Sequence, residues 1–136
     1  MSTFRTRFEN SNEVGVFSTL TNNYCLIPHG GKSQFRVFID ELVDIPVVKT
    51  TIAGTRVVGR LTAGNKSGLL LPNTTTESEL AHIRNYLPES IQVKVIEEKL
   101  SALGNVIVAN DHVALVHPDL DKVNLFYFLI FLIKLI

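Results

Sequence analysis

Three glycine-to-proline runs recur along the chain at nearly constant spacing. They read GVFSTLTNNYCLIP from Gly15, GRLTAGNKSGLLLP from Gly59 and GNVIVANDHVALVHP from Gly104, so their glycines are 44 and 45 residues apart. A polar turn interrupts each run, and an apolar stretch then leads to the proline. Similarity at a fixed period of this size is typical of one supersecondary unit used repeatedly. We therefore expect neighbouring copies of a single folding unit.

Length, charge and cysteine content narrow the class of protein. A chain of 136 residues, 46% hydrophobic and 19% charged, is typical of one globular domain. It carries 13 Lys and Arg and 13 Asp and Glu, so its net charge is zero. A protein that binds a phosphate backbone is normally clearly basic. The single cysteine, Cys25, excludes an internal disulfide framework and suits a reducing compartment. The opening residues MSTFRTRFEN lack the apolar region of a secretory signal.

Each unit is predicted to hold three strands followed by a helix. Apolar residues at i, i+3, i+4 and i+7 from Phe35 predict a helix over 33–43, and the capping-box spacing of Thr76 and Glu79 predicts another over 76–87. The expected units cover residues 3–46, 47–90 and 91–121, and the third lacks its amphipathic helix. One such unit cannot bury its own sheet face and must pack against its neighbours. The expected strands are 3–8, 15–17, 24–27, 47–52, 57–62, 69–71, 91–96, 106–109 and 113–116.

The last residues break the repeat. Residues 125–133 read LFYFLIFLI, which is aromatic, β-branched, uncharged and free of proline. A bilayer takes roughly 20 apolar residues, so we expect no membrane span. The composition is typical of aggregation-prone segments. We therefore expect residues 122–136 to be foreign to the fold and to promote self-association of the chain.

Longer motifs are spread along residues 5–121. They include TNNYCL at 21–26, IPVV at 45–48, HIRN at 82–85, LSALGN at 100–105 and VALVHPDL at 113–120. Through these motifs the chain resembles the N-terminal half of the eukaryotic translation initiation factor 6 family. The resemblance implies the pentein fold, an α/β propeller in which five ββαβ-type units close a ring. Residues 1–121 would then form an incomplete ring of two full units and most of a third, without the C-terminal repeats.

The resemblance also implies a function. The family binds the large ribosomal subunit on the face that meets the small subunit, which keeps the subunits apart, and it serves late large-subunit assembly. It implies contact mainly through a ribosomal protein, with little direct nucleic-acid binding, and a location in the cytoplasm and the nucleus, including the nucleolus. Neutral net charge fits a protein–protein contact, because direct rRNA binding needs many Lys or Arg contacts.

Five polar residues are candidates for this contact. Asn105 follows Gly104 as Arg60 follows Gly59, and equivalent positions in a ring point to the same end. The resemblance places the loops around Gly104 and Asn105 on the face that meets a ribosomal protein. The alternative for Asn105 is an ordinary turn asparagine. Asn65, Asp111 and His112 lie in the polar turns and are weaker candidates.

No catalytic residue, metal or cofactor is expected. Gly31, Lys32 and Ser33 do not form a phosphate-binding loop, because Leu26 stands where that motif needs its first glycine. Leu26 and Ile27 predict burial of Cys25, and the four histidines show no metal-ligand spacing. Two alternatives to the ribosomal function stay open. One is a cysteine-dependent pentein enzyme that modifies arginine-like substrates; the other is a truncated isoform or gene model with little activity.

Overall fold

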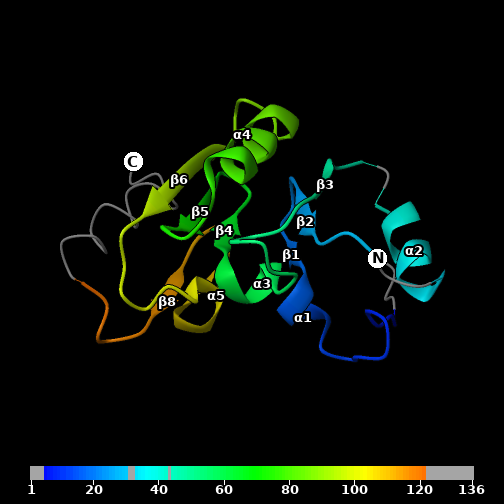
Figure 1. The fold of residues 1–136 in the computed structure, drawn as a ribbon, viewed down its shortest axis with the longest axis horizontal. Coiled ribbons are helices and arrows are strands. Elements are labelled where there is room, and N and C mark those ends of the chain that lie inside the picture. The colour runs from blue at the N-terminus through cyan, green and yellow to red at the C-terminus, as the bar shows by residue number, and fades with distance from the viewer. Residues whose placement is uncertain (1–4, 31–32, 43, 122–136) are drawn as a thin grey trace.

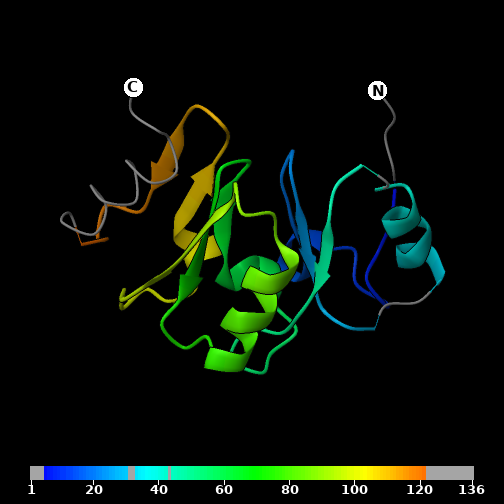
Figure 2. The same cartoon turned by 90° about the horizontal axis from the view of Figure 1, so that it is seen from above.

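A helix–hairpin unit occurs three times in residues 5–30, 33–42 and 44–121, the part of the chain that the computed structural model describes. Each unit opens with a four-residue helix that leads directly into an antiparallel hairpin. The three helices lie side by side in the lower middle of Figure 1, and the three hairpins project to the same side in Figure 2. The elements are α1 (Val14–Phe17), β1 (Thr19–Leu20) and β2 (Cys25–Ile27); α3 (Val58–Leu61), β4 (Ala63–Asn65) and β5 (Gly68–Pro72); and α5 (Leu103–Val106), β7 (Ile107–Ala109) and β8 (Ala114–Val116).

The first two units each continue into a longer helix and a further strand. These are α2 (Ser33–Asp40) with β3 (Val47–Lys49), and α4 (Glu77–Tyr86) with β6 (Gln92–Ile96). The strand β3 pairs in parallel with β2, and β6 pairs in parallel with β5. Two three-stranded sheets and one two-stranded sheet result within the described residues, and no pairing joins them into a closed sheet. The observed architecture is therefore a mixed α/β domain with several small sheets.

Each three-stranded sheet extends across a predicted unit boundary. The expected boundaries lie between residues 46 and 47 and between residues 90 and 91. The strands β3 and β6 follow these boundaries, but their partners are β2 and β5 of the preceding unit. Leu26 lies opposite Val48, and Leu70 lies opposite Lys94. β3 and β6 therefore complete the sheets of the units that begin with α1 and α3, so the observed units end later in the chain than the predicted ones.

The core lies on both faces of β5. Leu69 and Leu71 point to one side, where Ile83 of α4 packs with them, while Leu70 belongs to a second cluster with Leu103 of α5. Successive side chains of a strand point to opposite faces, so a strand buried on both sides is apolar throughout. A third cluster holds α2 against the first hairpin and contains Phe8, Cys25, Ile27 and Phe35.

The helix α4 begins where the sequence predicts. The Thr76 hydroxyl accepts a hydrogen bond from the backbone N–H of Glu79 at 3.2 Å, and the Glu79 carboxylate accepts one from the backbone N–H of Thr76 at 3.0 Å. This reciprocal pair satisfies two of the N–H groups that a helix start leaves free. The helix ends at Tyr86, before Leu87 and Pro88, because proline disfavours helical geometry in the residue before it.

The strands predicted over 15–17 and 57–62 are wrong, because these residues form α1 and α3. Valine-rich segments favour strands in isolation. Here a single helical turn is closed by the residue that follows it. The Ser18 hydroxyl donates to the carbonyl of Val14 at 2.7 Å, and the Thr62 hydroxyl donates to that of Val58 at 2.9 Å. The observed order of a full unit is therefore helix, strand, strand, helix, strand.

Tight turns shorten other predicted elements. The prediction of a strand over 3–8 fails for the described residues 5–7, and Phe8 forms only an isolated bridge with Ser11. The strand predicted over 47–52 ends at residue 49, and Ile52 forms the equivalent bridge with Thr55. Glu9 and Ala53 turn the chain at these places with φ of 52° and 53°. Neither residue type favours positive φ, so these two positions are not predicted, although Gly54, which follows Ala53 with φ of 74°, marks the second turn in the sequence.

Smaller differences occur at the ends of other elements. The predicted helix 33–43 ends at residue 40, and the strand predicted over 106–109 begins at residue 107 because Val106 closes α5. The prediction for residues 122–136 falls outside the described residues. Among the described residues, no helix combines the length and hydropathy that a membrane crossing requires.

Candidate functional site

Glycine allows the backbones of α1, α3 and α5 to touch. A Cβ atom at Gly59 would overlap the carbonyl oxygens of Gly15 and Ser18. A Cβ atom at Gly104 would overlap the carbonyl oxygen of Gly59 and lie 2.8 Å from that of Arg60. Only glycine fits such an approach without displacing the neighbouring helix. The recurring glycines therefore fix a row of three short helices.

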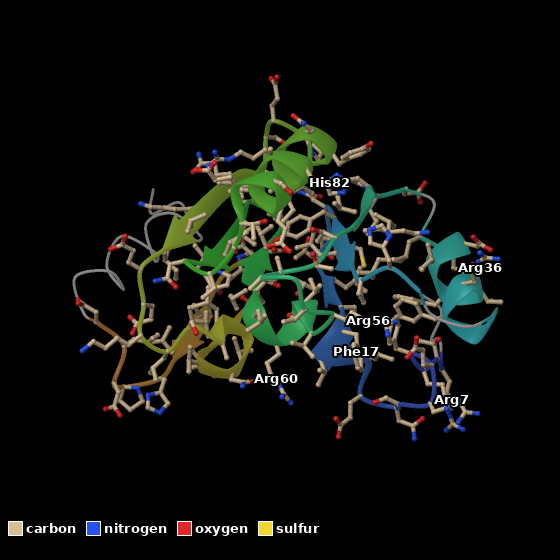
Figure 3. The ribbon with its side chains drawn as sticks, in the orientation of Figure 1. Arg7, Phe17, Arg36, Arg56, Arg60 and His82 are labelled. Atoms are coloured by element: carbon tan, nitrogen blue, oxygen red, sulfur yellow. The ribbon has the colours of Figure 1, made fainter. Side chains whose placement is uncertain are left out.

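Arg60 and Asn105 occupy the third position of α3 and α5. Both side chains are exposed, as the sequence predicts, and Arg60 projects away from the ribbon in Figure 3. Within the described part of the chain, neither side chain makes a hydrogen bond or an ion pair. Gly104, which precedes Asn105, touches the backbone of Arg60. Arg60 and Asn105 therefore lie on adjacent helical turns. The guanidinium offers a fork of donors and the amide offers both donors and an acceptor, which suits hydrogen bonding to another protein surface.

The hairpin turns meet at a hydrogen-bond network. Asp111 accepts a hydrogen bond from the Asn22 side chain at 2.6 Å and another from the backbone N–H of Lys66 at 3.0 Å. Asn23 donates to the carbonyl of Lys66 at 2.9 Å. The bond from the Lys66 N–H, helped by the Asn22 amide, holds the pKa of Asp111 below its ordinary value. Asp111 therefore links the turns of all three hairpins.

Asn65 is buried, with 2% of its surface exposed. Its side-chain oxygen accepts hydrogen bonds from the N–H groups of Ser67 and Gly68 at 2.9 and 3.2 Å, and its amide donates to the carbonyl of Asn110 at 3.3 Å. The side chain of Asn65 thus holds the turn, and its role as a contact residue stays a prediction that this burial does not favour. His112 is exposed beside this network.

The side chains that bind one unit to the next are not among the predicted site residues. The buried hydroxyl of Tyr24 donates to the carbonyl of Gly68 at 2.7 Å, and the hydroxyls of Thr19 and Thr62 lie 2.7 Å apart. These pairs are 44 and 43 residues apart in sequence, and Asn22 is 89 residues from Asp111. The separations match one or two repeat periods, so the period could have predicted which turns become neighbours.

An open hollow of about 510 Å³ lies beside the turn network. Its polar lining groups already bond to one another: Asn22 to Asp111, and Asn65 to the backbone of Asn110. A small-molecule site normally presents a few convergent polar groups to its ligand. The polar groups of this hollow are bonded to one another instead, so it does not resemble a small-molecule site. Its lining residues are Leu20, Thr21, Asn22, Leu42, Ile45, Gly64, Asn65, Ala109, Asn110 and Asp111.

Cys25 lacks the surroundings of a catalytic nucleophile. The side chain is fully buried in β2, and burial raises the pKa of its thiol to about 12. A reactive cysteine needs a lowered pKa and access to substrate. The geometry therefore argues against the cysteine-dependent enzyme. In the described residues, no three His, Cys, Asp or Glu side chains are grouped to hold a metal ion.

The fold and the site together define a class of protein. The chain is a small mixed α/β protein built from recurring helix–hairpin units, with exposed polar side chains on a row of glycine-packed helices. It belongs to the eIF-6 family, whose family model matches residues 3–126.

Three relatives are each named eukaryotic translation initiation factor 6. The protein from Saccharomyces cerevisiae is 62% identical over 120 residues, which is 87% of this chain and 49% of the yeast protein. The Candida albicans protein is 63% identical, and the Neurospora crassa protein 62%, over the same shares of each chain. The chain thus spans about half the length of the curated relatives it matches.

Proposed function

We propose that this chain acts as part of a translation initiation factor at the large ribosomal subunit. Family membership and the name shared by the relatives support the role in initiation. The factor would occupy the face of the large subunit that meets the small subunit, so that the two cannot join. It would also serve late large-subunit assembly, which places it in the cytoplasm and in the nucleus and nucleolus.

The observation that carries this proposal is the exposed pair Arg60 and Asn105. Both side chains lie on adjacent turns of glycine-packed helices and find no partner within the described part of the chain. A few well-placed anchors carry most of the energy of a protein interface, and arginine is enriched among them. We assign a ribosomal protein as the direct partner, because a chain of zero net charge has no excess of cations for rRNA phosphates.

The proposed fold behind this function is an incomplete pentein ring. The three helix–hairpin units in the described residues support it, since each presents its short helix to the same end of the molecule (Figure 1). Residues 1–121 would supply units over 3–46, 47–90 and 91–121. In a full ring, each further unit would place the residue equivalent to Arg60 and Asn105 at the same end.

The test is sedimentation with purified large ribosomal subunits, followed by addition of small subunits. The chain should sediment with the large subunit and reduce the joined fraction. Arg60→Ala and Asn105→Ala should each weaken binding roughly tenfold, which is the loss of one good anchor. Arg36→Ala and Asn85→Ala are matched controls, because both residues are exposed on other helices; Figure 3 shows Arg36 on α2, away from Arg60.

A largely inactive product is the second candidate. The chain covers about half of its relatives, and its third hairpin leaves Leu115 71% exposed. A chain that stays in the supernatant, while a full-length relative sediments with the same subunits, would support this candidate and contradict the first. Equal binding by the Arg60 variant and the Arg36 control would contradict the assigned contact surface.

A further inference from the structure

The short helix that carries Arg60 is contacted on both sides by the residues that join α1 to β1. Before Arg60, Gly59 lies so close to the carbonyl oxygen of Ser18 that a Cβ atom would overlap it. After Arg60, the hydroxyl of Thr62 lies 2.7 Å from the hydroxyl of Thr19. Two consecutive residues of the first unit therefore hold the backbone on either side of the arginine.

The direction of the hydroxyl pair follows from the single proton of each group. Thr62 is 2% exposed, and its hydroxyl donates to the carbonyl of Val58 at 2.9 Å. A hydroxyl has one proton to donate and two lone pairs that accept. Thr62 therefore accepts from Thr19, and the bonds run from the Thr19 hydroxyl through the Thr62 hydroxyl to the Val58 carbonyl. We call these three groups the hydroxyl chain.

The hydroxyl chain ends at the carbonyl that closes α3. The carbonyl of Val58 also accepts the backbone N–H of Thr62 at 3.2 Å, while the N–H of Arg60 donates to the carbonyl of Val57 at 3.1 Å. A single helical turn makes few such bonds and is unstable by itself in water, so bonds from outside the turn stabilise it. The backbone at Arg60 therefore depends on a side chain of the preceding unit.

The helix of the third unit lacks this support. Ile107 follows α5 as Thr62 follows α3, and it packs in the core without a hydroxyl. Val58 is fully buried, so water cannot replace the Thr62 hydroxyl at its carbonyl. The helix that carries the arginine thus has a hydrogen-bonded support that the helix of Asn105 does not have.

We propose that Thr19 and Thr62 are positioning residues for the ribosomal contact of Arg60. The hydroxyl chain fixes the backbone of α3 and with it the direction in which the Arg60 side chain leaves the helix (Figure 3). A guanidinium makes paired hydrogen bonds only in a defined geometry. Order present before binding reduces the entropy lost on binding, so affinity rises without a new contact. This inference rests on the proposed function, because both threonines act through Arg60.

The first test measures the affinity of the 136-residue chain for purified large ribosomal subunits by sedimentation. Thr19→Val and Thr62→Val remove a hydroxyl but keep the shape of the side chain, so each should weaken binding about threefold to tenfold. Thr19→Ser and Thr62→Ser keep the hydroxyl and should bind as the unmodified chain does. Thr50→Val is the matched control, because Thr50 is 3% exposed and its hydroxyl donates to the carbonyl of Thr51 instead of supporting α3.

A double-mutant cycle separates positioning from a general loss of stability. In an Arg60→Ala background, Thr62→Val should cause no further loss of binding, since positioning acts only through the guanidinium. Equal losses in both backgrounds would indicate a merely structural role and overturn the inference. Circular dichroism establishes that each variant folds. Thr19→Val repeats the comparison at a half-buried residue, where losing the hydroxyl disturbs the core least.

Hydrogen exchange of backbone N–H groups tests the hydroxyl chain without the ribosome. Exchange at Thr62, whose N–H bonds to the Val58 carbonyl, should become about tenfold faster in Thr19→Val but not in Thr50→Val. Unchanged exchange overturns the inference. So does unchanged binding of both valine variants when Arg60→Ala weakens binding. Unchanged binding of Arg60→Ala instead overturns the proposed contact surface, and the inference with it.

Discussion

Tyr24 connects the first hairpin to the second through one buried hydroxyl. Its ring lies in the core with Leu69, and its hydroxyl donates to the carbonyl of Gly68 at 2.7 Å. Burial, followed by the charge of Asp111, raises the pKa of this phenol far above its ordinary value of 10.0. The hydroxyl therefore remains a neutral donor across the physiological range.

Tyr24→Phe should lower the free energy of unfolding by about 1–2 kcal/mol, because the carbonyl of Gly68 loses its partner inside the core. Urea denaturation followed by circular dichroism measures the change. Tyr86→Phe is the control: that ring is 63% exposed, and its change should stay within about 0.5 kcal/mol. Equal denaturation midpoints for the two variants would contradict the role of the buried bond.

The sequence predicts the exposure of Arg60 and Asn105 because the repeat period places both after a glycine at equivalent positions. It does not predict the burial of Asn65, although that residue also lies in a polar turn. The difference is that the Asn65 side chain accepts hydrogen bonds from the N–H groups of Ser67 and Gly68 in its own turn and donates one to the carbonyl of Asn110 in the third hairpin. Composition cannot separate an asparagine that holds a turn from one that faces a partner.

Glu79 joins α4 to the turn that precedes α3. Its carboxylate caps the helix, accepts hydrogen bonds from the N–H groups of Ala53 and Gly54 at 2.8 and 3.0 Å, and binds the hydroxyl of Thr51. The sequence predicts the capping box, since that motif is local. It cannot predict the second set of bonds, because Gly54 marks the turn but nothing in the sequence brings that turn to Glu79, which lies 25 residues or more away.

Thr76→Ala should cost about 1 kcal/mol of stability, as is usual for a lost helix cap. Glu79→Ala should cost about 2 kcal/mol, because it also leaves the Thr51 hydroxyl and the N–H groups of Ala53 and Gly54 without their acceptor. Glu77→Ala removes an exposed acidic residue of the same helical turn and serves as the control, with a change below about 1 kcal/mol. The order of the three denaturation midpoints is the measurement, and a Thr76 effect as large as that of Glu79 would refute the linking role.

The same substitution should differ in effect at the three equivalent glycines. Gly104→Ala and Gly59→Ala should each lower stability by about 1–3 kcal/mol, because the added methyl meets a neighbouring carbonyl. Gly15→Ala meets open space and should be neutral or stabilising by up to about 1 kcal/mol. Thermal unfolding of the three variants at one low concentration checks the order. A loss at Gly15 equal to that at Gly104 would contradict the packing described.

The one-turn helices show where prediction from sequence fails. Helical periodicity needs several turns to be visible, and α1 and α3 have one turn each. Their valines favour strands locally, whereas contact with the next helix and the Ser18 or Thr62 hydroxyl fixes the turn. The longer elements α4, β5 and β6 are predicted well because the pattern of each extends over its whole length.

The molecule as a whole should lose stability in acid through two carboxylates. Burial alone would raise the pKa of Glu79, but its four hydrogen bonds outweigh burial and hold the pKa below the ordinary value of 4.5. The pKa of Asp111 is likewise held below 3.8. A depressed folded pKa gives stability that is present above the unfolded pKa and lost as pH falls through the folded one.

Urea midpoints should therefore be nearly constant from neutral pH to about pH 5 and fall at lower pH. Glu79→Gln and Asp111→Asn should each lower the midpoint at pH 7 and flatten the decline below pH ~4. Glu89→Gln, an exposed control, should leave both features unchanged. A decline as steep in the two variants as in the unmodified chain would exclude these carboxylates as its source.

The parallel pairing of β3 with β2 and of β6 with β5 has a consequence during synthesis. The chain leaves the ribosome from its N-terminus, so the first hairpin emerges with one edge unpaired. That edge is filled only after residue 49 has been made, and the edge of the second hairpin only after residue 96. Each of the first two hairpins therefore completes its sheet only with a strand made about 20 residues or more after it, so a nascent chain that stalls between the hairpin and that strand carries an open strand edge.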